Sequence, residues 1–154
     1  MDKATGRVSW TGAERDEMFR AYLTTALWSS TDDGESLDAT HEVDDIAPDA
    51  VATLREDVDD FYRANRALLC AWTTPQEAGH LFWLNRNGHG VGFWDRTLPG
   101  AADTAEYRKR YGITRAVARS RVRFNAAMTR LSDASKVYGA VDLYVGDDGA
   151  VHVL

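Results

Sequence analysis

The sequence predicts an α+β fold in which three or four helices pack on a small antiparallel sheet. Capping residues followed by apolar residues at three- and four-residue intervals predict helices over much of the chain. Alternating apolar residues near the C-terminus predict the strands. A chain of 154 residues is the size of one ordinary domain, so residues 1–154 are expected to fold as a single unit.

The first two helices have clear start signals. Thr11-Gly-Ala-Glu14 is a capping-box pattern, and the apolar stripe after it predicts a helix that runs to about Trp28. Residues 29–35 carry turn-forming side chains and predict an exposed loop. Pro48 suits the first turn of a second helix, whose apolar stripe continues to Leu69.

A third start signal precedes a stretch rich in glycine and aromatic residues. Thr74-Pro-Gln-Glu77 combines a cap residue, a first-turn proline and a glutamate, and it predicts a helix over 75–87. Gly88 can close that helix in the left-handed conformation. Residues 91–95 are then expected to form a strand.

The same residues also allow a hairpin, because Asn-Gly is a strong two-residue turn signal between strands 81–86 and 89–95. The hairpin would place His80 across from Asp95 as a buried pair. In the helix, His89 lies in the glycine-flanked connection and is the more accessible candidate for proton transfer. The capping residues favour the helix.

The last third of the chain predicts a long helix and a hairpin. An apolar stripe extends from Ile113 to Tyr138 at helical spacing. Strands are expected near 141–146 and 150–153, joined by a turn with two glycines and two aspartates. The strand at 91–95 is expected to complete their sheet.

Charge is unevenly distributed along the chain, whose net charge is −6. Residues 31–60 contain twelve acidic residues and one arginine, whereas 101–136 contain nine basic residues and three acidic ones. Arg115, Arg119 and Arg123 line one helix face and are the candidates for nucleic-acid binding through an arginine-rich helix over 108–123. The negative net charge of the chain favours a different role, in which these arginines pair with the acidic segment or face water.

Several chemistries lack a signature. Cys70 is the only cysteine and is expected to be a buried free thiol. The four histidines lack the spacing of metal ligands. We therefore expect no metal and no cofactor. No catalytic motif is present, which makes an enzyme the less favoured class. Residues 1–7 are polar, and no apolar run approaches the roughly 20 residues of a membrane span. We therefore expect a cytoplasmic protein without membrane association.

Distinctive segments occur along the chain: Ala26-Leu-Trp-Ser-Ser-Thr-Asp-Asp33, Asp44-Asp-Ile-Ala-Pro48, then, within the motif over residues 78–96, Ala78-Gly-His80, Phe82-Trp-Leu84, Arg86-Asn-Gly-His-Gly90 and Gly92-Phe-Trp-Asp-Arg96, and finally Val141-Asp-Leu-Tyr-Val-Gly-Asp-Asp-Gly149. In these segments the chain resembles a family of small, functionally uncharacterised bacteriophage and prophage proteins. The resemblance implies a phage origin and the cytoplasm of a bacterial host, but no mechanism. The chain departs from the pattern at Leu81 and Asn85 and in extra basic sequence around 101–125.

Two functional hypotheses concern the acidic segment and the glycine- and aromatic-rich motif. The first is a non-catalytic binder that modulates a host protein, with a host defence system as one candidate target. Its contact residues would be Arg86, Asn87, His89, Trp94, Arg96, Asp44 and Asp45. The second is a small-ligand enzyme or sensor, in which His89 is an acid or base, Asp95 orients it, and Arg86 and Arg96 hold an anion. The catalytic candidates are His80, His89 and Asp95.

Overall fold

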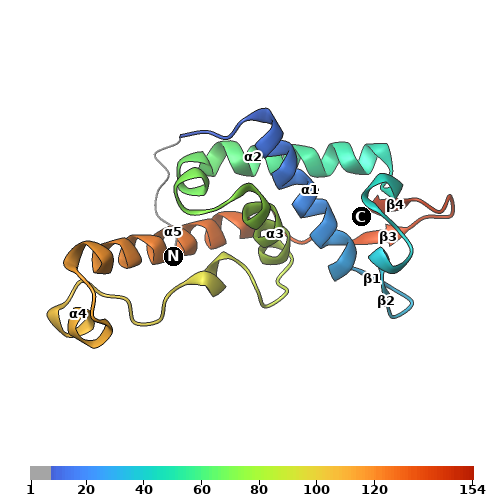
Figure 1. Cartoon of the computed structure of the whole chain (residues 1–154). Coiled ribbons are helices and arrows are strands. Elements are labelled where there is room, and N and C mark those ends of the chain that lie inside the picture. The colour runs from blue at the N-terminus through green and yellow to red at the C-terminus, as the bar shows by residue number, and fades with distance from the viewer. Residues whose placement is uncertain (1–7) are drawn as a thin grey trace.

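The computed structural model describes residues 8–154, so the predicted polar segment 1–7 lies outside the described residues. The fold belongs to the α+β class (Figure 1), but residues 8–154 contain five α-helices, not three or four. Two small antiparallel sheets of two strands each accompany them. The elements are α1 (Gly12–Ser29), β1 (Thr31–Asp32), β2 (Glu35–Ser36), η1 (Leu37–Ala39), η2 (Val43–Asp45), α2 (Pro48–Trp72), α3 (Pro75–Arg86), η3 (Phe93–Arg96), α4 (Ala105–Tyr111), α5 (Arg115–Lys136), β3 (Leu143–Val145) and β4 (Val151–Val153).

The three predicted helix starts are confirmed. At the start of α1 the Thr11 hydroxyl accepts the Glu14 N–H, and the Glu14 carboxylate accepts the Thr11 N–H, as a capping box requires. Helix α2 starts at Pro48. Thr74 caps α3 by accepting the N–H of Glu77. The predicted loop over 29–35 instead includes the small hairpin of β1 and β2.

Helix α2 is kinked at Asn65, which has non-helical backbone angles of φ −123° and ψ 18°. The Asn65 side-chain amide donates to the carbonyl of Phe61, four residues earlier, at 3.0 Å. A side chain bonded to the carbonyl of the preceding turn is a recognised cause of helix bending. The kink divides a 25-residue helix into two shorter segments around the core.

The core forms where α1 crosses α3. Gly79 of α3 lies so close to α1 that an added Cβ would overlap the Met18 carbonyl oxygen. This close approach buries the aromatic rings of α3 between the neighbouring helices. Phe82 stacks on Phe61 with ring centroids 4.0 Å apart, and Trp83 meets the Tyr22 ring edge-on at 5.3 Å.

The strand predicted at 91–95 is wrong, and so is the hairpin alternative. Residues 81–86 belong to α3, and Phe93–Arg96 forms the short 3-10 helix η3. Asn85, buried near the end of α3, accepts the N–H of Phe93 at 2.9 Å and donates to the Ser132 carbonyl at 3.2 Å. The connection is therefore bonded to a helix side chain, and its Phe93 ring lies in the core.

The C-terminal hairpin is confirmed, although its strands are shorter than predicted. Strands β3 and β4 pair antiparallel, with Tyr144 opposite His152. The hairpin attaches to the start of α2, where the Ala47 N–H donates to the Val151 carbonyl at 2.8 Å. The sheet thus closes one end of the helical core and does not form a layer beneath it.

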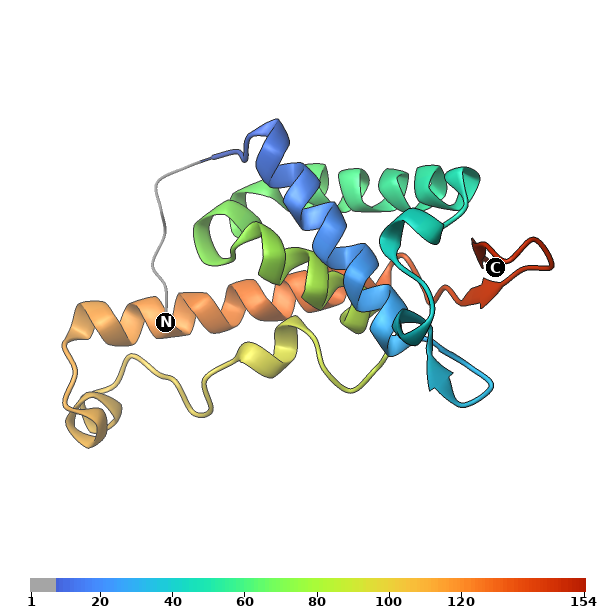
Figure 2. The ribbon, with the colours of Figure 1, turned by 45° about the vertical axis from the view of Figure 1, so that its right-hand side comes forward.

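Helix α4 and the first half of α5 extend away from this core (Figures 1 and 2). The first half of α5 buries only Ala118, whereas its second half supplies Met128 and Leu131 to the core. Helix α4, which the sequence reading did not separate from α5, buries only Tyr107. None of the helices within residues 8–154 combines the length and apolar character that a membrane crossing requires.

Candidate functional site

Arg86, a predicted ligand-binding residue, lies inside the protein. Only 1% of its side chain is exposed. Its Nε donates to the Gly139 carbonyl at 2.8 Å and its Nη2 to the Tyr138 carbonyl at 2.9 Å. Its Nη1 donates to the Tyr22 hydroxyl at 3.0 Å and to the Asp57 carboxylate at 2.7 Å. The guanidinium is thus held by protein groups on all sides, which leaves it no geometry for an external anion.

Two tyrosines next to Arg86, Tyr22 and Tyr138, have raised pKa values. Burial raises the pKa of Tyr22 to about 12, although the adjacent guanidinium opposes this change. Burial and the hydrogen bond to Asp60 raise the pKa of Tyr138 above its usual value. Both phenols therefore stay protonated at neutral pH and act as hydrogen-bonding groups of the structure.

The other motif residues do not converge with Arg86. Asn87 is half-buried and bonds to the backbone of Trp83 and Val141. His89 and Asp95 are exposed, and Trp94 is 48% exposed. Of the four residues of the predicted small-ligand site, only Arg96 lines one of the grooves and hollows described below, and His89, Asp95 and Arg86 line none of them.

A different residue, His80, lies in a groove of about 580 Å³ between α1 and α3. Trp28 lies at the C-terminal end of α1, is 45% exposed, and stacks on the imidazole with centroids 6.0 Å apart. Arg96 also lines the groove, 3.8 Å from the Glu77 carboxylate. The sequence placed His80 among the candidates, but the partner predicted for it, Asp95, is not in contact with it.

Hydrogen bonding fixes the tautomer of His80. The Thr25 hydroxyl donates its one proton to the Ala21 carbonyl at 2.8 Å, so it accepts from His80 Nδ1, 2.9 Å away. In the neutral ring Nε2 is then the unprotonated nitrogen, and no described residue bonds to it. Burial, assisted by the Arg96 charge, lowers the pKa of His80, which favours the neutral form.

The arrangement around His80 suits binding better than catalysis. Within residues 8–154 no carboxylate hydrogen-bonds to the ring, and Thr25 is 2% exposed with its proton committed to the backbone. Within this groove His80 therefore has no carboxylate partner that would form an acid–base pair with it, and Thr25 is not an activated nucleophile. The groove instead offers His80 Nε2 as a hydrogen-bond acceptor, next to the exposed indole of Trp28.

A second groove, of about 650 Å³, lies on the other flank of α1. Its floor is largely apolar, with Phe19, Leu23 and Ile46 among its lining residues, and the predicted contact residue Asp44 lies along it. A third hollow of about 370 Å³ adjoins it and includes His41 and Asp44. Asp45 lines neither and caps η2 by accepting the N–H of Glu42.

Arg20 is common to all three hollows. It is exposed and forms no ion pair within residues 8–154. Sequence reasoning missed both Arg20 and Trp28, although both fall outside the apolar stripe of the first predicted helix. We call the following residues the α1 face: Glu17, Arg20, Thr24, Trp28, Asp44, His80 and Arg96.

The predicted nucleic-acid candidates lie on α5, away from the α1 face. Arg115 and Arg119 both approach the Asp103 carboxylate, at 3.7 and 2.9 Å. Arg123 lies with Trp72 and Arg130 along a hollow of about 540 Å³. Within residues 8–154 these arginines form no ion pair with the acidic segment 31–60, so the predicted pairing between the two segments is wrong.

No group of three or more His, Cys, Asp or Glu side chains in the described part of the chain is placed to hold a metal ion. Comparison with known proteins gives no match among family models, curated proteins or solved structures. The function is therefore inferred from the geometry of this chain alone.

Proposed function

We propose that this protein is a non-catalytic binder that docks on a partner protein through the α1 face. The observation that carries the proposal is the pair of grooves on the two flanks of α1, which share the Arg20 side chain, a cation without an ion pair within residues 8–154. The predicted contact residues Asp44 and Arg96 lie on opposite flanks of the same helix. A ridge with a groove on each side offers a broad surface, which a protein can cover more fully than a small molecule.

The side chains of the α1 face match those that dominate protein interfaces. Tryptophan and arginine are enriched among residues that carry most of the binding energy. Trp28 and Arg20 provide one of each on the same exposed side of α1. Asp44 and Glu17 add acidic groups at the rim, where charge contributes mainly to orientation and association rate.

The lining residues define the chemistry of the partner. The apolar groove beside Ile46 and Pro48 can receive an aliphatic or aromatic side chain. Arg20 requires an acidic group on the partner, and Asp44 requires a basic one. The partner surface therefore carries an apolar anchor flanked by charges of both signs.

The resemblance to phage proteins leads us to place the partner in a bacterial host. Binding would then modulate a host process by occupying a protein surface, and a defence component is one candidate. The small-ligand alternative receives no comparable support, since its proposed residues are dispersed and Arg86 is enclosed.

The first prediction tests the α1 face with charge-matched variants. Arg20→Glu and Trp28→Ala should each reduce recovery of a discrete partner from host lysate at least tenfold, because each removes an interface anchor. Lys136→Glu makes the same charge change on α5, outside the three grooves, and should leave recovery unchanged. Circular dichroism establishes that the variants fold.

The reconstituted complex then provides the decisive measurement. Titration calorimetry with the purified partner should reproduce the ranking of the variants. Equal affinity for the parent chain, Arg20→Glu and Trp28→Ala would refute this use of the α1 face, even if a partner were recovered.

A further inference from the structure

The two charged segments occupy different ends of the molecule. Residues 101–123, here called the basic arm, contain seven basic residues and only Asp103 and Glu106 as acids. The basic arm comprises α4 and the first half of α5 and lies at one end of the molecule, whereas the acidic segment begins at the other end with β1 and β2 (Figures 1 and 2). Because the segments are apart, the acidic segment does not neutralise the arm at close range.

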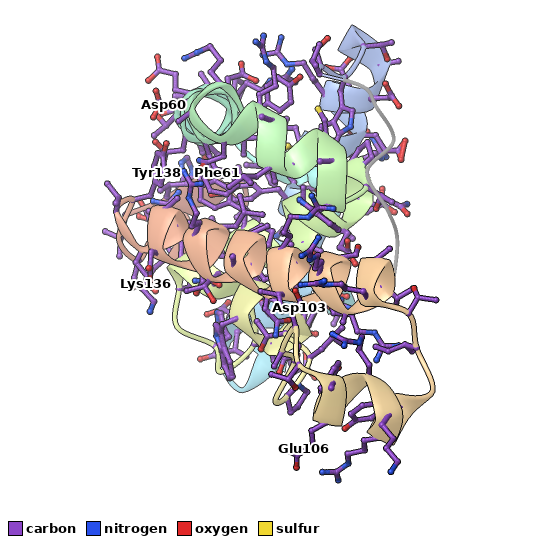
Figure 3. All side chains as sticks on the ribbon, turned by 90° about the vertical axis from the view of Figure 1, so that its left-hand side faces the viewer. Asp60, Phe61, Asp103, Glu106, Lys136 and Tyr138 are labelled. Carbon is purple, nitrogen blue, oxygen red and sulfur yellow. The ribbon has the colours of Figure 1, made fainter. Side chains whose placement is uncertain are left out.

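Within the basic arm, Asp103 is surrounded by three guanidinium groups. Its carboxylate lies 3.1 Å from Arg108, 3.7 Å from Arg115 and 2.9 Å from Arg119. The hydrogen bond from Arg119 is the main cause that lowers the pKa of Asp103. Figure 3 looks toward this end of the molecule and labels Asp103 between α4 and α5. One carboxylate neutralises one positive charge, so the cluster retains a positive surplus.

An exposed aromatic ring lies on the same arm. Tyr111 is 48% exposed and packs against Tyr107 with centroids 4.7 Å apart. The guanidinium carbons of Arg110 and Arg121 lie 5.7 and 5.8 Å from the Tyr111 ring centroid. The Tyr107 hydroxyl accepts from Arg121 at 3.3 Å, which links the α4 ring pair to α5.

The cationic surface continues along α5 from Arg123, the last residue of the arm, to Arg130. Arg123 and Arg130 lie beside the half-buried indole of Trp72 in the hollow of about 540 Å³, and neither forms an ion pair within residues 8–154. Arginines at successive turns of one helix can follow a line of phosphates. An aromatic ring among cations adds a stacking surface for a base.

We propose that the basic arm binds single-stranded nucleic acid, with phosphates contacting Arg115 and Arg119 and an unpaired base stacking on Tyr111. The arginines alone would suit any polyanion. Tyr111 selects a strand whose bases are free to stack, since the bases of a duplex are already paired and stacked. Asp103 then acts as an internal competitor, because its carboxylate occupies the place that a phosphate takes in the complex.

This site lies outside the α1 face, so its test is separate from that of the partner-binding proposal. The probe is a fluorescein-labelled 20-nucleotide oligothymidylate, and the readout is anisotropy of the full chain at several salt concentrations. We expect binding that weakens steeply as salt rises, because phosphate contacts release counterions. Arg20→Glu should leave this affinity within about twofold.

Variants of the arm assign the contacts. Tyr111→Ala should weaken binding about fivefold or more through loss of stacking, while Tyr111→Phe should restore it. Arg119→Gln should weaken binding and lower the magnitude of the logarithmic salt slope by about 0.7. Asp103→Asn should strengthen binding, because it removes the competing carboxylate. Arg63→Gln, an exposed arginine on α2, is the matched control and should have little effect.

Four results would overturn the proposal. The first is absence of salt-dependent oligonucleotide binding by the folded parent chain. The second is unchanged or weaker binding by Asp103→Asn when circular dichroism shows an intact fold. The third is tighter binding of a 20-base-pair duplex that is insensitive to Tyr111→Ala. The fourth is binding of heparin without binding of the oligonucleotide.

Discussion

Arg86 and His80 show how context changes the role of a polar residue. Both belong to the same motif and lie on the same helix. The guanidinium carbon of Arg86 lies 5.6 Å from the Phe82 ring centroid and 5.7 Å from the Tyr138 ring centroid, and the group donates to four acceptors. His80 lies six residues earlier and lines an open groove. A sequence motif does not distinguish these positions, because the distinction depends on which helices cover each face.

The second prediction concerns stability and tests the structural role of Arg86. Arg86→Ala should reduce the free energy of unfolding by roughly 3 kcal/mol or more, because it leaves two carbonyls and the Asp57 carboxylate without their donor. Arg96→Ala, whose pairing is long and exposed, should change it by less than about 1 kcal/mol. Urea denaturation measures both. A loss below 1 kcal/mol for Arg86→Ala would contradict the structural role.

At the scale of elements, the contact between α1 and α3 organises the molecule. It places Phe82 and Trp83 in the core and His80 beside Trp28 at the surface. The contact depends on Gly79, since any larger residue would meet the α1 backbone. Glycine is unfavourable inside a helix, so its presence in α3 is explained by close packing and not by helix propensity.

The third prediction is that Gly79→Ala destabilises the protein by at least about 2 kcal/mol and widens the α1–α3 groove. The new Cβ would overlap backbone atoms of α1, which cannot rotate away as a side chain can. Gly12→Ala is the matched control, because a Cβ at residue 12 meets nothing within 4 Å, and it should be neutral or slightly stabilising. Thermal unfolding compares them, and equal melting temperatures would refute the close-packing argument.

Residues 91–95 show that a local sequence pattern can predict the wrong element. Their aromatic and glycine residues predict a strand, but the backbone N–H of Phe93 bonds to the buried side chain of Asn85. Gly92 packs directly on that side chain, where a Cβ would overlap it. A single buried amide from α3 therefore replaces the strand partner that the local sequence pattern implied.

For the whole molecule, the main feature is the separation of a packed core from the extended basic arm. Helix α4 contacts the rest of the protein through few buried side chains. Asn125 fixes the connection before the arm by bonding to both the N–H and the carbonyl of Leu98. The arm is thus anchored at its base, while its outer part remains accessible to a polyanion.

The fourth prediction follows from this uneven burial. Native-state hydrogen exchange should show lower opening free energies for α4 and the first half of α5 than for α1 and α3, because the arm buries only Tyr107 and Ala118. Binding of the oligonucleotide should slow exchange in the arm selectively. Equal protection of the arm and of α3 in the free protein would contradict this division.

Local sequence by itself determined the helix starts at Thr11 and Thr74, the first-turn proline of α2, and the C-terminal hairpin. It could do so because capping, proline geometry and alternation act over a few neighbouring residues. Only the tertiary structure decided that Arg86 turns inward, that Arg20 and Trp28 are exposed beside His80, and that the charged segments lie apart. These outcomes depend on contacts between residues distant in the chain, and short-range patterns carry no information about which surfaces those contacts cover.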